Sequence, residues 1–200
     1  MTLKEKTISG VVWAVAEQSA SKLVGLLLTI ILARILAPAE FGLIAMLSVF
    51  ISVGSSLIDS GLTSSLIRSN DISQKDYSTV FLFNLGGSIV IYFILFFAAP
   101  LIALFYKQEM LINIIRIYGI SFIINSFFTV QNARLSKEMN FKTQTLINIP
   151  SVIAGGIVGV VLAKLGYGVW SLVWMSLSNS MVTTLMYWIV SDWRPNLVFD

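Results

Sequence analysis

The sequence predicts an all-α protein that crosses a membrane several times, because it is rich in apolar residues and poor in charge. Of its 200 residues, 56% are hydrophobic and only 12% are charged. Soluble domains are usually about 45–50% apolar and about 25% charged, so this chain has too few charges to cover a soluble surface. Six spanning helices of roughly 20 residues would use about 120 residues, which leaves only short connections and no room for a folded soluble domain.

Six apolar segments are separated by polar or helix-breaking residues, and we predict one spanning helix for each. Pro38 ends the first segment, the polar stretch 68–78 follows the second, and Lys107 lies between the third and the fourth. Ser73 and Asp76 have the spacing of a capping box before the third helix. We therefore expect one bundle over residues 1–200, with spans near 10–36, 41–67, 79–105, 110–132, 144–163 and 168–190.

Lys and Arg residues are distributed unevenly between the two sides of this predicted bundle. The side that holds both termini and the loops 68–78 and 133–143 carries eight of the 13 Lys and Arg residues, and the other side carries three. Short cytoplasmic loops are enriched in Lys and Arg. We therefore predict that both termini are cytoplasmic, and that the net charge of +3 reflects these loops and not nucleic-acid binding.

Four charged residues inside the predicted spans are candidates for binding a substrate or a coupling ion. Charged side chains are costly within a bilayer, so they usually face a cavity, a partner or the interface. A fixed Lys22–Asp59 ion pair is the structural alternative, and Arg116 could equally extend to the outer interface. The candidates are Glu17 and Lys22 on a polar face of the first span, Asp59 on a polar face with Ser48, Ser52, Ser55 and Thr63, and Arg116 in the fourth span.

Other polar residues in the spans predict helix packing more than chemistry. Ser151, Gly155 and Gly159 repeat every four residues, which is typical of closely packed membrane helices. The chain has no His and no Cys, which excludes zinc sites, thiol catalysis and Ser-His-Asp triads. We expect no catalytic residue, no metal and no cofactor, and a protein that is not an enzyme.

Several short motifs follow one another along the chain. They are Leu32-Ala-Arg-Ile-Leu-Ala-Pro-Ala-Glu-Phe-Gly-Leu-Ile-Ala45, Gly61-Leu62 with Leu66-Ile67-Arg68, Asn132-Ala-Arg134 with Met139-Asn-Phe141, Gly168-Val-Trp170, and Trp193-Arg-Pro195. Together, in this order, they resemble the polysaccharide biosynthesis branch (colanic-acid exporter and teichuronic-acid type) of the oligosaccharide flippases, within the multidrug/oligosaccharidyl-lipid/polysaccharide superfamily.

The resemblance implies a flippase of the bacterial inner membrane that moves an undecaprenyl-diphosphate-linked oligosaccharide between leaflets by alternating access. Such proteins usually have twelve or more spans in two lobes, so this chain resembles an N-terminal lobe. The resemblance then implies either a missing C-terminal lobe or a homodimer. In the implied role, Lys22 is the best candidate to hold the diphosphate, and Arg116 is the second. Glu17 and Asp59 would tune Lys22 or carry a coupling ion.

Three other functions stay open at this point. A drug or cation antiporter of the same superfamily fits the spans, although the long motif at residues 32–45 argues against it. A membrane-embedded polysaccharide polymerase would be expected to have a large periplasmic loop or an acidic cytoplasmic motif, and the sequence has neither. A non-transporting structural bundle would explain the polar faces as helix packing.

Overall fold

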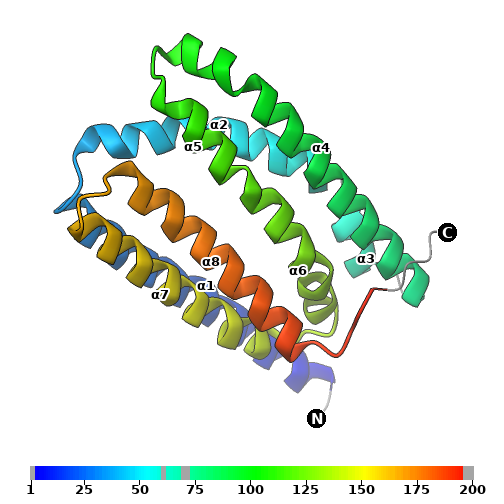
Figure 1. The fold of residues 1–200 in the computed structure, drawn as a ribbon. Helices are drawn as coiled ribbons and strands as arrows, with labels where there is room; N and C mark the ends of the chain where they lie inside the picture. The colour runs from blue at the N-terminus through cyan, green and yellow to red at the C-terminus, as the bar shows by residue number, and fades with distance from the viewer. Residues whose placement is uncertain (1–2, 60–61, 69–72, 196–200) are drawn as a thin grey trace.

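The computed structural model describes residues 3–59, 62–68 and 73–195, without the side chains of residues 3–12, 14, 16, 17, 59, 62 and 68, which include Glu17 and Asp59. This part of the chain is helical and contains no strand (Figure 1). The helices are α1 (Leu3–Ala33), α2 (Pro38–Asp59), α3 (Leu62–Arg68), α4 (Gln74–Tyr106), α5 (Met110–Tyr118), α6 (Ile120–Lys137), α7 (Phe141–Lys164) and α8 (Val169–Val190).

The helices confirm an all-α protein that crosses a membrane more than once. Four helical stretches of the described residues are long and apolar enough to cross a bilayer: Pro38–Ile58, Gln74–Tyr106, Met110–Lys137 and Phe141–Lys164. The described apolar part of α1, Gln18–Ala33, is shorter. Helix α8 is not among the four, although it has 22 residues, because Ser, Thr and Asn interrupt its apolar sequence. Six spans therefore stay a prediction.

The connections between helices gather at two opposite ends of the bundle. The turns α1–α2, α4–α5 and α7–α8 lie at one end in Figure 1. The start of α1, the α6–α7 turn and the segment after α8 lie at the other. This alternation is the one predicted from the order of the apolar segments, and it places both ends of the described chain on the same side.

The second and fourth predicted spans each carry two helix labels. The second, expected over residues 41–67, is described as α2, which ends at Asp59, and α3, which begins at Leu62, and residues 60–61 lie outside the described residues. The fourth forms the single helical stretch Met110–Lys137, in which Gly119 joins α5 and α6 with helical backbone angles (φ −57°, ψ −25°). A Cβ atom at Gly119 would lie only 3.1 Å from Cδ2 of Tyr92, so the glycine lets α4 approach closely at this point.

Two local predictions are confirmed. The Ser73 backbone N–H donates to Oδ2 of Asp76 at 2.8 Å, and the Asp76 N–H donates to Oγ of Ser73 at 3.3 Å, which makes the capping box that begins α4. On α7, Gly155 and Gly159 face α8, where the side chain of Met175 lies against Gly159. Helix α7 therefore lies between α8 on one side and α1 on the other.

The turn before α8 depends on a glycine at position 168. Gly168 has φ +57° and ψ −132°, a combination that an L-residue adopts only with backbone strain. A Cβ atom there would also collide with Oε1 of Glu40, whose other carboxylate oxygen accepts the Ala37 N–H at 2.8 Å. Gly168 therefore lets the α1–α2 turn and the α7–α8 turn lie against each other.

We expect Gly168→Ala to lower the melting temperature of the protein in detergent micelles. Gly166→Ala is the matched control, because Gly166 also has positive φ, at +82°, but a Cβ atom added there would meet no atom within 4 Å. Both variants carry the backbone strain, and only the first also displaces Glu40. Equal melting temperatures for the two variants would contradict the contact between the two turns.

Candidate functional site

A cavity of about 300 Å³ lies between α2, α3, α4 and α6. None of the described residues that line it is charged, and eight of the ten carry a hydroxyl or a carboxamide. Phe122 and Ile58 are the apolar part of its wall. The lining residues are Ser55, Ile58, Thr63, Asn84, Ser88, Phe122, Asn125, Ser126, Thr129 and Asn132.

The α4 wall of this cavity carries buried polar atoms without partners. Asn84 and Ser88 lie one turn apart, and each is only 1% exposed. Both amide atoms of Asn84, the Ser88 hydroxyl and the Thr63 hydroxyl on α3 find no hydrogen-bond partner within the described part of the chain. Leaving a buried donor or acceptor unpaired costs about 1–3 kcal/mol, so these atoms favour a polar occupant of the cavity.

The α6 wall is held in place by hydrogen bonds within the bundle. Thr129 donates its hydroxyl to the Asn125 carbonyl at 2.9 Å. Oδ1 of Asn132 accepts from Nε2 of Gln144 at 2.9 Å and from the Tyr187 hydroxyl at 2.8 Å. Asn132 is thereby tied to α7 and α8, and the two N–H groups of its amide remain to serve a ligand.

Part of this cavity was predicted as a polar helix face. The polar face of the second span, with Ser55 and Thr63, does line it. Asn84 and Ser88 were missed because the site prediction rested on charged residues. An asparagine four residues before a serine in a long apolar helix was the available signal, since that spacing puts both on one face.

The predicted charged residues lie away from this cavity where their side chains are described. Lys22 is exposed on α1, a helix that packs on α7, and Lys22 has no ion pair with any described residue. The Arg116 guanidinium lies over the Phe96 ring, 4.3 Å from its centroid, and Nε of Arg116 donates to the Phe96 carbonyl at 3.5 Å. The side chains of Glu17 and Asp59 lie outside the described residues, as does any Lys22–Asp59 pair. The binding roles of all four stay predictions.

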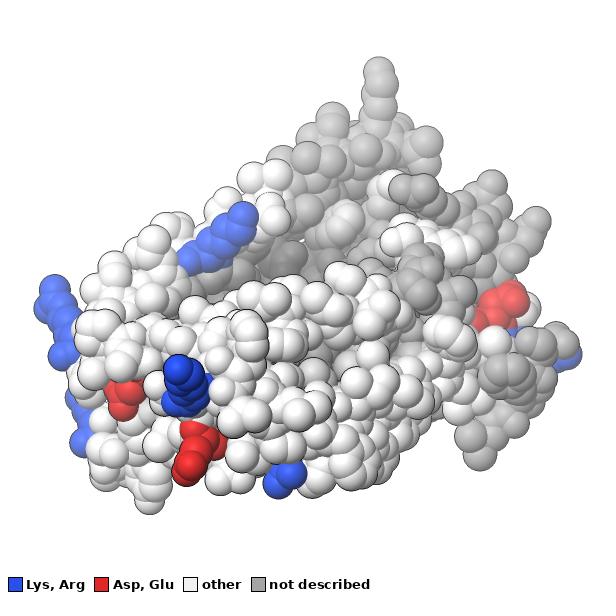
Figure 2. Space-filling model, turned by 90° about the horizontal axis from the view of Figure 1, so that it is seen from above, with Lys and Arg blue, Asp and Glu red and all other residues white. Residues whose placement is uncertain are grey.

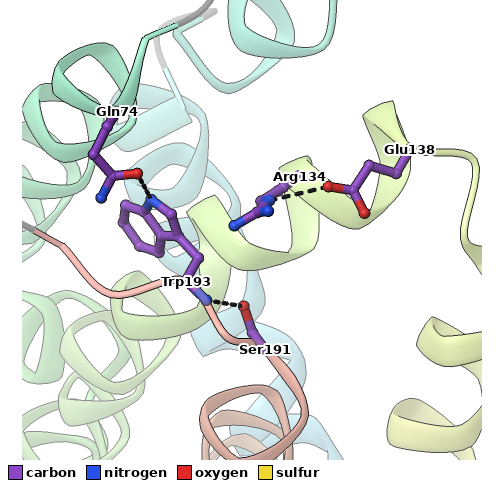
Figure 3. Close-up of polar contacts among 5 residues, drawn as sticks. All are labelled: Gln74, Arg134, Glu138, Ser191 and Trp193. Atoms are coloured by element: carbon purple, nitrogen blue, oxygen red, sulfur yellow. Dashed lines mark hydrogen bonds and ion pairs between the residues drawn. The ribbon is translucent and has the colours of Figure 1, made fainter.

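Charged side chains gather at the two ends of the bundle, and the middle of the face in Figure 2 is almost free of them. At the end that holds the segment after α8 lies a second pocket, of about 250 Å³. Nε of Arg134 pairs with Oε1 of Glu138 at 3.0 Å on its rim (Figure 3). The lining residues are Gln131, Arg134, Leu135, Glu138, Asn140, Thr143, Val190, Ser191 and Asp192.

Comparison with known proteins identifies the family. The family of polysaccharide biosynthesis proteins matches residues 31–200, which is most of the chain. The chain belongs to this polysaccharide biosynthesis protein family. Two residues of the motifs have clear structural surroundings. Leu32 is 1% exposed and packs beside α7, and Gly168 lies in the turn that contacts Glu40.

Three bacterial biosynthesis proteins are similar in sequence to the chain. It is 30% identical to the lipopolysaccharide biosynthesis protein WzxC of Escherichia coli (strain K12), over 100% of the chain and 41% of WzxC. It is 29% identical to the succinoglycan biosynthesis transport protein ExoT of Rhizobium meliloti (strain 1021), over 100% of the chain and 40% of ExoT. It is 28% identical to the teichuronic acid biosynthesis protein TuaB of Bacillus subtilis (strain 168), over 72% of the chain and 30% of TuaB.

The chain therefore spans about two fifths of the length of WzxC and of ExoT. Comparison with solved structures finds no match.

Proposed function

We propose that this chain is part of a flippase that moves a lipid-linked oligosaccharide across the bacterial inner membrane during synthesis of a surface polysaccharide. The observation that carries the proposal is a cavity lined by amides and hydroxyls inside a membrane-spanning bundle of this family. A polar cavity at membrane depth is costly unless it serves a polar ligand. The name of ExoT as a transport protein supports the same conclusion.

The transported molecule would be an oligosaccharide on a polyprenyl diphosphate, and the protein would move it without chemical change. The absence of charge among the described lining residues favours a neutral polar ligand over the cation of an antiporter. The excess of Lys and Arg at one end supports cytoplasmic termini. Since the chain spans about two fifths of WzxC, alternating access would need a second lobe, from further residues or from a second copy.

Deletion of the native gene tests this function. We expect complete undecaprenyl-diphosphate-linked repeat units to accumulate, as measured by mass spectrometry of a lipid extract, while surface polysaccharide falls. Return of the gene on a plasmid is the control and should restore both quantities. Accumulation of incomplete units would instead indicate a role in assembly. Unchanged lipids and polymer, in a strain that makes the polymer and has no second flippase, would contradict the proposal.

A further inference from the structure

We infer that the cavity between α2, α3, α4 and α6 is a subsite for one uncharged sugar ring of the substrate, and that the diphosphate binds elsewhere. This inference rests on the proposed function, because it divides the lipid-linked substrate into two parts. It assigns to Asn84, Ser88 and Thr63 the recognition of sugar hydroxyls.

The hydrogen-bonding groups of the cavity match those of a sugar. Each sugar hydroxyl both donates and accepts a hydrogen bond, and the carboxamide of Asn84 offers a donor and an acceptor side by side. Both atoms are unpartnered among the described residues, and the side chain is 1% exposed. The Ser88 hydroxyl, one turn further along α4, and the Thr63 hydroxyl on α3 extend the same surface. Both atoms are buried, so Asn84 would pair with two adjacent sugar hydroxyls once its side chain turns into the cavity.

The rest of the cavity wall limits how a ring can lie. Asn132 offers only N–H groups freely, because its carbonyl oxygen already accepts from Gln144 and Tyr187. Phe122, which is 5% exposed, and Ile58 make the apolar part of the wall. A few fixed polar groups on an apolar wall are typical of small-molecule sites.

The diphosphate does not fit this cavity electrostatically. Cations stabilise a diphosphate removed from water best, and the described lining residues include no Lys or Arg. The guanidinium of Arg116 is held against Phe96, and Lys22 lies on α1, which packs on α7. We therefore place the charged part of the substrate outside the cavity and the sugar inside.

The volume sets the size of the ligand. A water molecule takes up about 30 Å³ of liquid, so 300 Å³ corresponds to about ten waters. That space holds a single sugar ring with a few waters and is too small for an oligosaccharide repeat unit. The subsite would therefore bind one sugar ring, and the other sugars of the repeat unit would lie elsewhere along the transport path.

Binding of short lipid probes tests the inference on the full chain in nanodiscs. The probes are farnesyl diphosphate and its glucosyl, galactosyl and N-acetylglucosaminyl esters. We expect at least one glycosyl probe to bind more tightly than farnesyl diphosphate. Asn84→Leu should lower the affinity for that glycosyl probe about tenfold and change the affinity for farnesyl diphosphate by less than about twofold. This is the effect expected for lost hydrogen bonds to the sugar.

Two further variants keep the test decisive. Asn113→Leu is the matched control, because Asn113 is exposed on α5 and does not line the cavity, and it should bind all probes like the parent. Ser88→Ala is a smaller change, to be used if Asn84→Leu lowers the melting temperature. It should lower the affinity for the glycosyl probe alone.

The outcomes separate the subsite from the proposed function. If the parent binds every probe equally, or if Asn84→Leu and Ser88→Ala weaken all probes alike or none, the sugar subsite is wrong while a lipid-linked substrate stands. If the parent binds no probe, with or without sugar, the proposed substrate class fails and the subsite fails with it.

Discussion

Gly155→Ala is expected to destabilise the bundle by about 1–3 kcal/mol, the usual cost of overpacking a tight contact. The added Cβ atom would lie 2.7 Å from the Met175 carbonyl oxygen and 2.8 Å from Cβ of Asn179. The first of these is backbone, and it cannot yield unless α8 moves away from α7. Because α7 also packs on α1 through Gly156, such a shift would disturb three helices. The melting temperature in detergent micelles measures the loss.

Gly87→Ala provides the matched control within a long helix. Gly87 lies in α4 with no atom within 4 Å of a Cβ position, so alanine there meets open space. Alanine is favoured over glycine in a helix by about 1 kcal/mol, so this variant should be as stable as the parent or slightly more stable. If Gly155→Ala and Gly87→Ala have the same melting temperature, the close packing of α7 on α8 is wrong.

This α7 surface was predictable because its signal is local. Small residues at four-residue spacing fall on one side of a helix whatever the rest of the chain does. The capping box of Ser73 and Asp76 was predictable for the same reason, since both partners lie within one turn. Four of the expected spans were likewise evident from uninterrupted apolar sequence.

The candidate site was only partly predictable, because periodicity gives the face of a helix and not its neighbour. The polar faces with Ser55 and Asn125 meet at a common cavity, whereas Lys22 lies on a helix that packs on α7. Which polar faces meet is decided by tertiary packing. Asn84, at the buried side of the cavity, carries no charge, so it does not stand out among the polar residues of the sequence.

No packing role was predicted for the segment after α8, where Trp193-Arg-Pro195 is only one of the motifs that resemble the family. Trp193 is instead 4% exposed and packs with Leu66 of α3, Phe81 of α4 and Val130 of α6. Its indole Nε1 donates to Oε1 of Gln74 at 2.7 Å, as Figure 3 shows. Nε2 of Gln74 in turn donates to the Arg194 carbonyl at 2.8 Å. The segment is thereby fixed to the start of α4.

Trp193→Ala should therefore cost about 3–5 kcal/mol, the range for removing a buried large aromatic side chain. The indole also contacts the Tyr77 ring at a centroid distance of 6.1 Å and the Phe81 ring at 6.2 Å, and both contacts would be lost. Trp193→Phe keeps a ring in this cluster and removes the hydrogen bond to Gln74, so it should cost only about 1 kcal/mol. Melting temperatures of the two variants measure the difference.

The effect of Trp193→Ala should also reach the cavity, because Leu66 joins α3 to the same cluster and Thr63 lies one turn earlier on α3. Amide hydrogen exchange in α3 should therefore become faster in Trp193→Ala and stay nearly unchanged in Trp193→Phe. Trp174→Ala is the matched control, since Trp174 is 42% exposed on α8 and its loss should leave exchange in α3 unchanged. Equal exchange in Trp193→Ala and the parent would mean that α4 and α6 hold α3 without Trp193, and that the segment after α8 does not support the cavity wall.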